Sequence, residues 1–267
     1  MINKVLVLIA WQLSLPVGLV AENFQPITVI FNNDSPADLD AVEPALFGAT
    51  DLGLQALIGE DGRIEVTETN GQPQTYVGKV GTRCTGTLIG PSHVLTAGHC
   101  VYDIKSERWF RDLYFTPALN KDEKPHGMIN WQRVLVTEGF TQSHDVAWDF
   151  AVIILSEPIG DSLGWLNLNR VEPGLTSEIV LFGYPNDKAV GSMWQANGSM
   201  ESFTDQRLEH SCDTAPGMSG ASLLRTSPDT LETTIYGVHS WGSVGTNGGV
   251  PINDVVYDKI TEWLTQF

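Results

Sequence analysis

The strongest constraint on the fold is a series of short apolar runs, rich in Val, Ile, Leu and Thr, that turn residues separate. Turn signals such as Gly90-Pro91 and Glu157-Pro158 lie between the runs. The runs cover residues 85–89, 94–97, 134–137, 150–155, 179–182, 221–224 and 235–239. Many short strands at such spacing predict an all-β fold, arranged as a barrel or a sandwich.

One α-helix is predicted at the end of the chain, where apolar residues change to helical spacing. Asn253 or Asp254 can cap its N-terminus. The apolar side chains at helical spacing are Val256, Ile260, Trp263, Leu264 and Phe267.

Residues 1–21 have the layout of a secretory signal peptide. Lys4 precedes an apolar run, and cleavage is expected after the small residue Ala21. A membrane anchor is the alternative. However, Pro16 and Gly18 interrupt the run, so it is shorter than the roughly 20 residues that a membrane span needs. We therefore expect a secreted protein, extracellular or periplasmic, with no membrane contact after cleavage.

Residues 22–55 differ from the rest of the chain because they contain several acids, three prolines and no basic residue. They show no clear periodicity. We expect a pro-segment that is removed on maturation, and a disordered linker is the alternative. Residues 56–267 then form the functional domain.

The chain is strongly acidic, with 32 Asp and Glu against 15 Lys and Arg and a formal net charge of −17. A surface of this sign repels phosphate groups, which excludes nucleic acid and anionic membranes as expected partners.

Three short sequences bring in chemistry: residues 95–100 (LTAGHC), 148–153 (WDFAVI) and 213–220 (DTAPGMSG). A serine hydroxyl is a weak nucleophile and needs a base such as histidine, which in turn needs an ionised carboxylate to orient it. Glycine permits a tight backbone turn, so two adjacent N–H groups can point at an oxyanion. A pattern with all these groups is typical of acyl transfer by a serine nucleophile.

These motifs resemble the chymotrypsin-like serine peptidases over residues 58–267, with the order His, Asp, Ser. The resemblance implies two six-stranded antiparallel β-barrels and a triad of His99, Asp149 and Ser219. It also implies an oxyanion hole formed by the N–H groups of Gly217 and Ser219. The α/β-hydrolases have another order, and their G-x-S-x-G turn is absent here.

Asp145 competes for the role of triad acid, but a longer strand-like run follows Asp149 directly. We expect a disulfide between Cys84 and Cys100, as in that family, which leaves Cys212 as a buried free thiol. No metal-ligand spacing or cofactor motif is found among the remaining histidines, which include His93, His126, His144 and His210.

Within this superfamily the chain is similar to the bacterial V8-like glutamyl endopeptidases. The shared stretches are residues 58–63 (IGEDGR), residues 183–187 (GYPND) and Met193-Trp194. His239 stands where glutamate-specific members have a histidine, and Thr214 matches their pocket threonine. A histidine and a hydroxyl can hydrogen-bond a substrate carboxylate, which favours Glu or Asp at P1.

Three further residues complete the expected substrate site. The resemblance implies that Ser240, Trp241 and Gly242 pair with the substrate backbone and form one wall of the P1 pocket. Asp213 is ambiguous, because trypsin-like enzymes place an acid there to bind Lys or Arg. A basic P1 preference read by Asp213 is therefore the main alternative to glutamate.

Activation is expected to differ from that of trypsin-like zymogens. There, the new N-terminus pairs with an acid directly before the serine, and here that residue is Met218. We expect a new terminus near Ala56 to lie close to the P1 pocket and add positive charge there.

The sequence thus predicts a serine endopeptidase that acts on proteins or peptides as a monomer. A protease-like binding module without activity is a second hypothesis, and ester hydrolysis on the same machinery is a third. All expected catalytic residues are present, which favours the enzyme.

Overall fold

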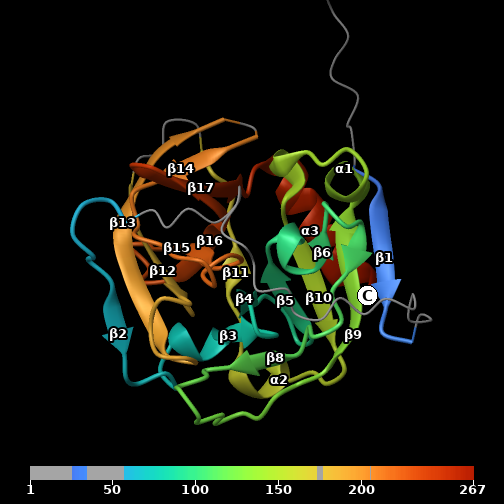
Figure 1. Ribbon diagram of the computed structural model, residues 1–267, viewed down its shortest axis with the longest axis horizontal. Helices are drawn as coiled ribbons and strands as arrows, with labels where there is room; N and C mark the ends of the chain where they lie inside the picture. Colours follow the sequence, from blue (N-terminus) through green and yellow to red (C-terminus); the bar gives the residue numbers. More distant parts are fainter. Residues whose placement is uncertain (1–25, 35–56, 173–176, 205) are drawn as a thin grey trace, which may run out of the picture.

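Two antiparallel β-sheets form the two halves of the molecule in this computed structural model (Figure 1). The structure describes residues 26–34, 57–172, 177–204 and 206–267. The expected signal peptide, residues 1–21, lies outside the described residues, as does most of the expected pro-segment.

The first sheet has seven strands in the order β1-β9-β10-β5-β4-β3-β8. These are β1 Thr28–Asn32, β9 Trp131–Thr137, β10 Ala151–Leu155, β5 His93–Thr96, β4 Cys84–Leu88, β3 Val77–Val80 and β8 Phe115–Pro117. The strands β4, β5 and β10 are buried and, apart from His93, contain apolar residues and Thr, which explains why the sequence pattern indicated them.

The second sheet closes into a ring of six strands, β16-β15-β12-β13-β14-β17, since β16 also pairs with β17. The ring strands are β12 Ser177–Gly183, β13 Met193–Phe203, β14 Leu208–His210, β15 Ser222–Thr226, β16 Thr233–Ser243 and β17 Thr246–Pro251. Two short strands extend this sheet, β2 Ile64–Val66 on β13 and β11 Asn167–Leu168 on β16.

The remaining elements are short, except for the C-terminal helix. They are β6 Tyr102–Asp103, β7 Arg108–Trp109, α1 Glu138–Thr141, α2 Gly160–Leu163, α3 Asp254–Gln266 and the 3-10 helices η1 Gln74–Tyr76, η2 Gly98–Cys100 and η3 Val146–Trp148. The side chain of Asn253 caps α3 by accepting from Val256 N. Val256, Ile260 and Trp263 then pack into the core of the first sheet. No helix among the described residues is long and apolar enough to cross a membrane.

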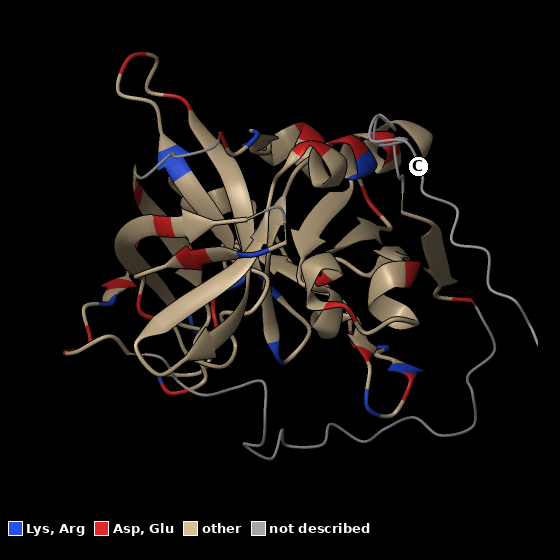
Figure 2. Cartoon of the chain, turned by 90° about the horizontal axis from the view of Figure 1, so that it is seen from above, with Lys and Arg blue, Asp and Glu red and all other residues tan. Residues whose placement is uncertain are grey.

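The all-β fold with a C-terminal helix is confirmed, and every expected apolar run lies within or overlaps a strand. The strand counts differ from six per sheet because β1, β2 and β11 add to the edges. Within the segment 22–55, residues 28–32 form the edge strand β1 on β9, although the sequence there shows no clear periodicity. Acidic residues are distributed over both halves of the surface rather than gathered in one patch (Figure 2).

Candidate active site

His99 and Asp149 lie together because their strands are neighbours in the first sheet. His99 is in η2, just after β5, and Asp149 directly precedes the strand-like run that leads into β10. The two strands pair with Ala151 opposite Thr96. Asp149 Oδ2 lies 2.8 Å from His99 Nδ1, and Asp149 Oδ1 accepts from His99 N at 2.8 Å. The carboxylate therefore holds both the ring and the backbone of the histidine.

The competing acid, Asp145, has a different contact. Its Oδ1 accepts from Ala147 N at 3.0 Å and caps η3. Asp149, not Asp145, is the partner of His99 in the structure.

The environment of His99 sets its basicity. Burial of the imidazole disfavours its charged form, but the charge of Asp149 and the hydrogen bond to it outweigh burial and raise the pKa of His99 above its ordinary value. A histidine with its Nδ1–H directed to a carboxylate leaves Nε2 as the basic nitrogen. The pair can therefore act as a general base at neutral pH.

Ser219 lies on a tight turn between the two sheets, which two glycines make possible. Gly217 has φ +100° and Gly220 has φ +85°. A Cβ at Gly220 would lie 2.2 Å from Thr85 O and from Thr96 Oγ1, so only glycine fits there. Ser219 O accepts from Thr85 N at 2.9 Å and fixes the turn to β4.

The Ser219 side chain completes the expected group only by position. Cys100 Sγ, next to His99 in the chain, lies 3.7 Å from Ser219 O. Among the described residues, however, Ser219 Oγ makes no hydrogen bond to His99. Catalytic hydrogen bonds are often long or poorly aligned before substrate binds, so this geometry is compatible with Ser219 as the nucleophile.

Two backbone N–H groups on this turn are available to a ligand. In the described part of the chain, neither Gly217 N–H nor Ser219 N–H donates to a protein acceptor. The carbonyl oxygens in the same peptide units are held, because Pro216 O accepts from Asn186 N at 2.7 Å and Met218 O accepts from Ala221 N at 3.0 Å. A peptide held by its oxygen has a fixed N–H direction, as an oxyanion hole requires.

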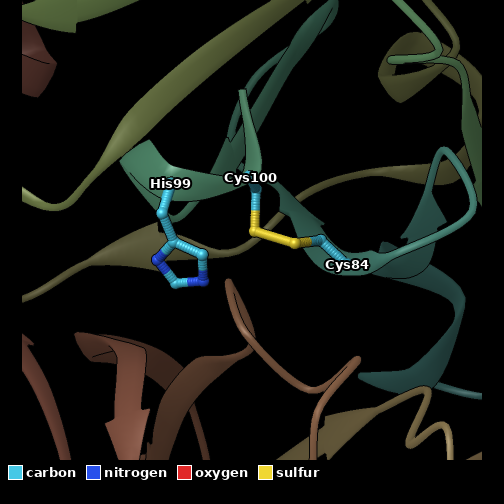
Figure 3. A group of neighbouring side chains, drawn as sticks. All are labelled: Cys84, His99 and Cys100. Atoms are coloured by element: carbon cyan, nitrogen blue, oxygen red, sulfur yellow. A yellow bond between two sulfur atoms is a disulfide. The ribbon is translucent and has the colours of Figure 1, made fainter. Parts of the chain in front are cut away.

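The expected disulfide between Cys84 and Cys100 is present beside His99 (Figure 3). The two sulfurs and a ring nitrogen of His99 lie within 4.8 Å of one another. The two sulfurs are bonded to each other in the disulfide, so this group has no thiolate that could bind a metal. The third cysteine, Cys212, is free and buried as expected. Burial, and to a smaller extent the charge of Asp213, raises the pKa of its thiol to about 12.

His239, which the sequence analysis expects in the P1 pocket, is buried. Its Nδ1 lies 3.1 Å from Gly248 O and 3.2 Å from His210 Nε2. Nε2 has no protein partner among the described residues and is not sealed from solvent. Burial lowers the pKa of His239 to about 4, and the pKa of His210 is lowered well below its ordinary value by burial and then by His239. Both rings are therefore neutral in the free enzyme at pH 7.

Asp213 is held by the segment that opens the domain. Its Oδ1 accepts from Ile58 N at 2.7 Å, and its Oδ2 accepts from Gly62 N at 2.8 Å. Both oxygens are thus satisfied by backbone N–H groups, and the side chain is 8% exposed.

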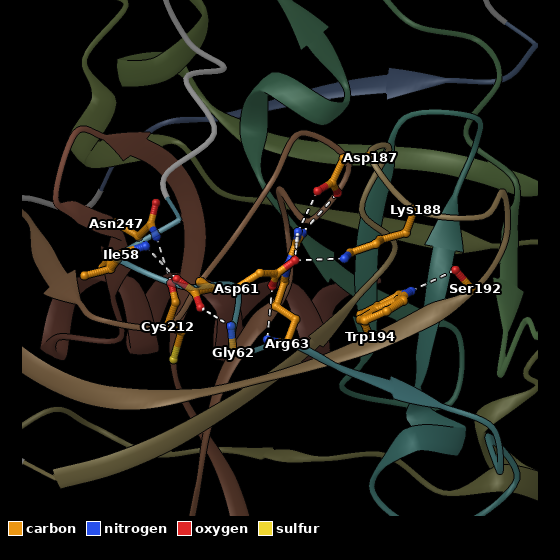
Figure 4. A network of polar contacts seen from close by, with 11 residues as sticks. Ile58, Asp61, Gly62, Arg63, Asp187, Lys188, Ser192, Trp194, Cys212 and Asn247 are labelled. Atoms are coloured by element: carbon orange, nitrogen blue, oxygen red, sulfur yellow. Dashed lines mark hydrogen bonds and ion pairs between the residues drawn. The ribbon is translucent and has the colours of Figure 1, made fainter.

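Arg63 anchors the same segment (Figure 4). Its side chain is fully buried and binds Asp61 and Asp187, while Lys188 binds Asp61 from outside. Burial lowers the pKa of Arg63, but its hydrogen bonds to the two carboxylates outweigh this and raise the pKa. Those bonds also connect the segment to the loop after β12.

The other residues expected in the pocket are buried or belong to β16. Thr214 and Ser240 are buried, and Trp241 and Gly242 continue β16 opposite Gly248 and Asn247. The register shifts between His239 and Trp241, which places a bulge at Ser240. Sequence reasoning missed the contact of His210 with His239 and the anchoring role of Arg63. The only signal for the latter was an arginine that closely follows two acids in residues 60–63.

Comparison with known proteins agrees with this geometry. The family model described as Trypsin matches residues 63–264. The chain belongs to the trypsin family. It is a serine endopeptidase, and its substrates are proteins or peptides.

Individual relatives of this trypsin-family enzyme are known. The chain is 31% identical to a glutamyl endopeptidase of Bacillus licheniformis over 222 residues, 79% of this chain and 69% of that protein. It is 29% identical over 228 residues to a Bacillus subtilis protein named extracellular metalloprotease, 80% of this chain and 72% of that protein. A solved structure of a Glu endopeptidase in complex with MPD has a TM-score of 0.73 and 30% identity, and the match covers 78% of this chain and 99% of that one.

Proposed function

We propose that this peptidase is secreted and cleaves peptide bonds after Glu or Asp, with Ser219 as nucleophile, His99 as base and Asp149 as the orienting acid. In this mechanism His99 Nε2 takes the proton as Ser219 Oγ attacks the scissile carbonyl. The N–H groups of Gly217 and Ser219 stabilise the oxyanion. His99 then protonates the leaving amine, and water, activated by the same histidine, hydrolyses the acyl-enzyme.

One observation carries the glutamate preference: both oxygens of Asp213 are occupied by Ile58 N and Gly62 N. A basic P1 side chain would need that carboxylate, and it would have to displace two hydrogen bonds to reach it. With Asp213 satisfied, the pocket presents no free acid, and a substrate carboxylate meets less repulsion.

His239 supplies the attraction in this proposal. Its Nε2 is the ring nitrogen without a protein partner. A substrate carboxylate at Nε2 favours a proton there and makes a strong hydrogen bond in a buried site. The name of the Bacillus licheniformis relative, glutamyl endopeptidase, supports the same preference.

Maturation is proposed to remove residues 1–21 and to cut the chain near residue 56. The new ammonium would lie two residues before Ile58, whose N–H is 2.7 Å from Asp213 Oδ1. A positive charge would thus sit beside the pocket, without the acid that trypsin-like zymogens use and that is replaced here by Met218. N-terminal sequencing tests this, because fully active material that starts at Glu22 would contradict it.

Cleavage-site profiling of the mature enzyme on a peptide library tests activity and specificity together. We expect cuts after Glu and fewer after Asp, whereas cuts after Lys or Arg would support the reading through Asp213. A fluorophosphonate probe should label Ser219 and leave the Ser219→Ala variant unlabelled. No labelling of the wild-type protein would favour an inactive binding module.

A further inference from the structure

The edge strand β1 belongs to the segment that the proposed maturation cuts from the domain, yet it is built into the first sheet. Thr28 to Asn32 pair with Thr137 to Arg133 on β9 along the full length of the strand (Figure 1). Two further backbone bonds extend the ladder, Glu138 N to Ile27 O and Asn33 N to Gln132 O, each 2.9 Å long. Without β1, the outer edge of β9 would present unpaired backbone groups.

Aromatic packing fixes the strand to the domain. The ring of Phe31 stacks on Trp109 with centroids 4.7 Å apart and on Trp131 at 5.6 Å. The guanidinium of Arg111 also lies over the Phe31 ring, 4.8 Å from its centroid. Loss of β1 would uncover these two tryptophans and remove both stacked pairs.

Two side-chain hydrogen bonds join β1 to the helix α3 and to the strand β9. Trp263 Nε1 on the buried face of α3 donates to Thr28 Oγ1 at 2.8 Å, and Trp263 itself is 0% exposed. Arg133 Nε donates to Asn32 Oδ1 at 2.9 Å. If the strand left, the N–H group of Trp263 would lose its acceptor, Thr28 Oγ1.

The strand also supports the segment that ends at the catalytic acid. β9 runs directly into α1, and the bond of Glu138 N to Ile27 O holds the first residue of that helix. Trp263, which donates to Thr28 in β1, packs on Phe150 with ring centroids 5.6 Å apart, and Phe150 directly follows Asp149. The contacts of β1 therefore stabilise the same half of the molecule that positions His99 and Asp149.

We propose that β1 stays bound after the chain is cut, so that the mature peptidase consists of the protease chain and a short, noncovalently held peptide containing residues 27–33. This inference rests on the proposed maturation near residue 56. The interaction surface is the outer edge of β9 with the slot of Trp109 and Trp131, and its occupant is the enzyme's own N-terminal strand.

The test uses the full chain from residue 22 with Ser219→Ala, which prevents self-cleavage, and a recognition sequence for a site-specific protease placed between residues 40 and 50. After complete cutting, gel filtration without denaturant is followed by intact-mass analysis. We expect the peptide and the protease chain in one peak. Separation of the peptide on this column, with an unchanged melting temperature of the remaining chain, would overturn the inference.

Synthetic peptides of residues 24–36 then show which contacts retain the strand, and the protease chain stays unaltered throughout. The native peptide should exchange with the bound one, and a Phe31→Ala peptide should bind at least tenfold more weakly. The matched control is Ile30→Ala, because Ile30 is 44% exposed and its replacement should leave binding unchanged. Equal binding of the Phe31→Ala peptide would contradict the proposed slot.

Mass and binding are measured here on a protein that cannot cleave peptides. Failure of the retained strand is therefore distinguishable from failure of the proposed glutamate specificity, which the library profile of the active enzyme reports.

Discussion

The basicity of His99 depends on one neighbouring residue, so the pH profile should report it. In the proposed mechanism the imidazole must be neutral to accept the proton of Ser219, and Asp149 raises the pKa of His99 above its ordinary 6.5. We expect kcat/KM to fall as the pH drops through that raised pKa, with the midpoint above 6.5. In Asp149→Asn burial alone remains, so the midpoint should move below 6.5, and kcat should fall by about 10⁴. An unchanged midpoint in this variant would show that another group controls the acid limb.

His210 is expected to act as a positioning residue for His239. If Nδ1 of His239 donates to Gly248 O in the neutral ring, Nε2 carries a lone pair and repels a substrate carboxylate. His210 Nε2–H at 3.2 Å can instead donate to Nδ1 and favour the tautomer with Nε2–H in the pocket.

We expect His210→Phe, which keeps the ring shape and removes this donor, to raise KM for Glu substrates by about tenfold with kcat nearly unchanged. Steady-state kinetics on paired peptides with Glu or Gln at P1 checks this, because the Gln peptide should not respond. His93→Phe, a buried histidine in β5, is the control for ring replacement in general. Equal effects on both peptides would assign His210 a purely structural role.

Among the elements, the domain-opening segment 58–63 depends on Arg63. Replacement of one member of a buried ion pair leaves its partners with less compensation, and here Asp187 would lose its cation while Asp61 would keep only Lys188. Both carboxylates are partly exposed, so we expect Arg63→Met to cost about 2 kcal/mol, below the full buried-pair range. Denaturant unfolding measures the free energy.

The Arg63 variant should also raise KM for Glu substrates, because Ile58 N and Gly62 N of the same segment hold Asp213. The matched control is Arg170→Met, which removes the exposed pairs with Asp254 and Asp258 and should cost less than about 1 kcal/mol. A stability loss no larger than that of the control would show that the Arg63 network does not anchor the segment.

Sequence patterns predicted those elements whose side chains are buried on both faces. β10 is buried at every position and appears as an uninterrupted apolar run. β13 was missed because one face is open to solvent, so polar residues and Gly interrupt its 11 residues. β1 was missed because its neighbours in sequence are acids and prolines, and its partner β9 lies about a hundred residues away.

The same distinction applies to the site. Residue types and chain order indicated His99, Asp149 and Ser219, since the chemistry restricts which residues can serve. The direction of the Asp213 carboxylate was open, because it depends on hydrogen bonds from residues more than 150 positions earlier. The contact of His210 with His239 likewise depends on the register of β14, β17 and β16, which no local pattern specifies.

On the scale of the whole molecule, the site requires both sheets. His99 and Asp149 come from the first sheet, and the Ser219 turn and His239 come from the second. Thr85 N to Ser219 O and Thr85 Oγ1 to Gly217 O are bonds across this junction. Chemistry on either half alone is therefore not expected, and the stability of the junction determines activity.

The acid excess of the chain acts against this stability. With 32 acidic and 15 basic residues, most carboxylates have no cation to pair with, and like charges repel over about 30 Å at 10 mM salt but only about 8 Å at 150 mM. Salt also weakens surface ion pairs, but these contribute only about 0–1 kcal/mol each. Repulsion should dominate, so we expect the melting temperature at pH 7.5 to rise by several degrees between 10 and 150 mM NaCl. Calorimetry at both salts checks this, with a series near pH 5, closer to the pI of about 4.5, as the control that should respond less. A melting temperature that falls with salt at pH 7.5 would mean that ion pairs, not net charge, control the stability of the fold.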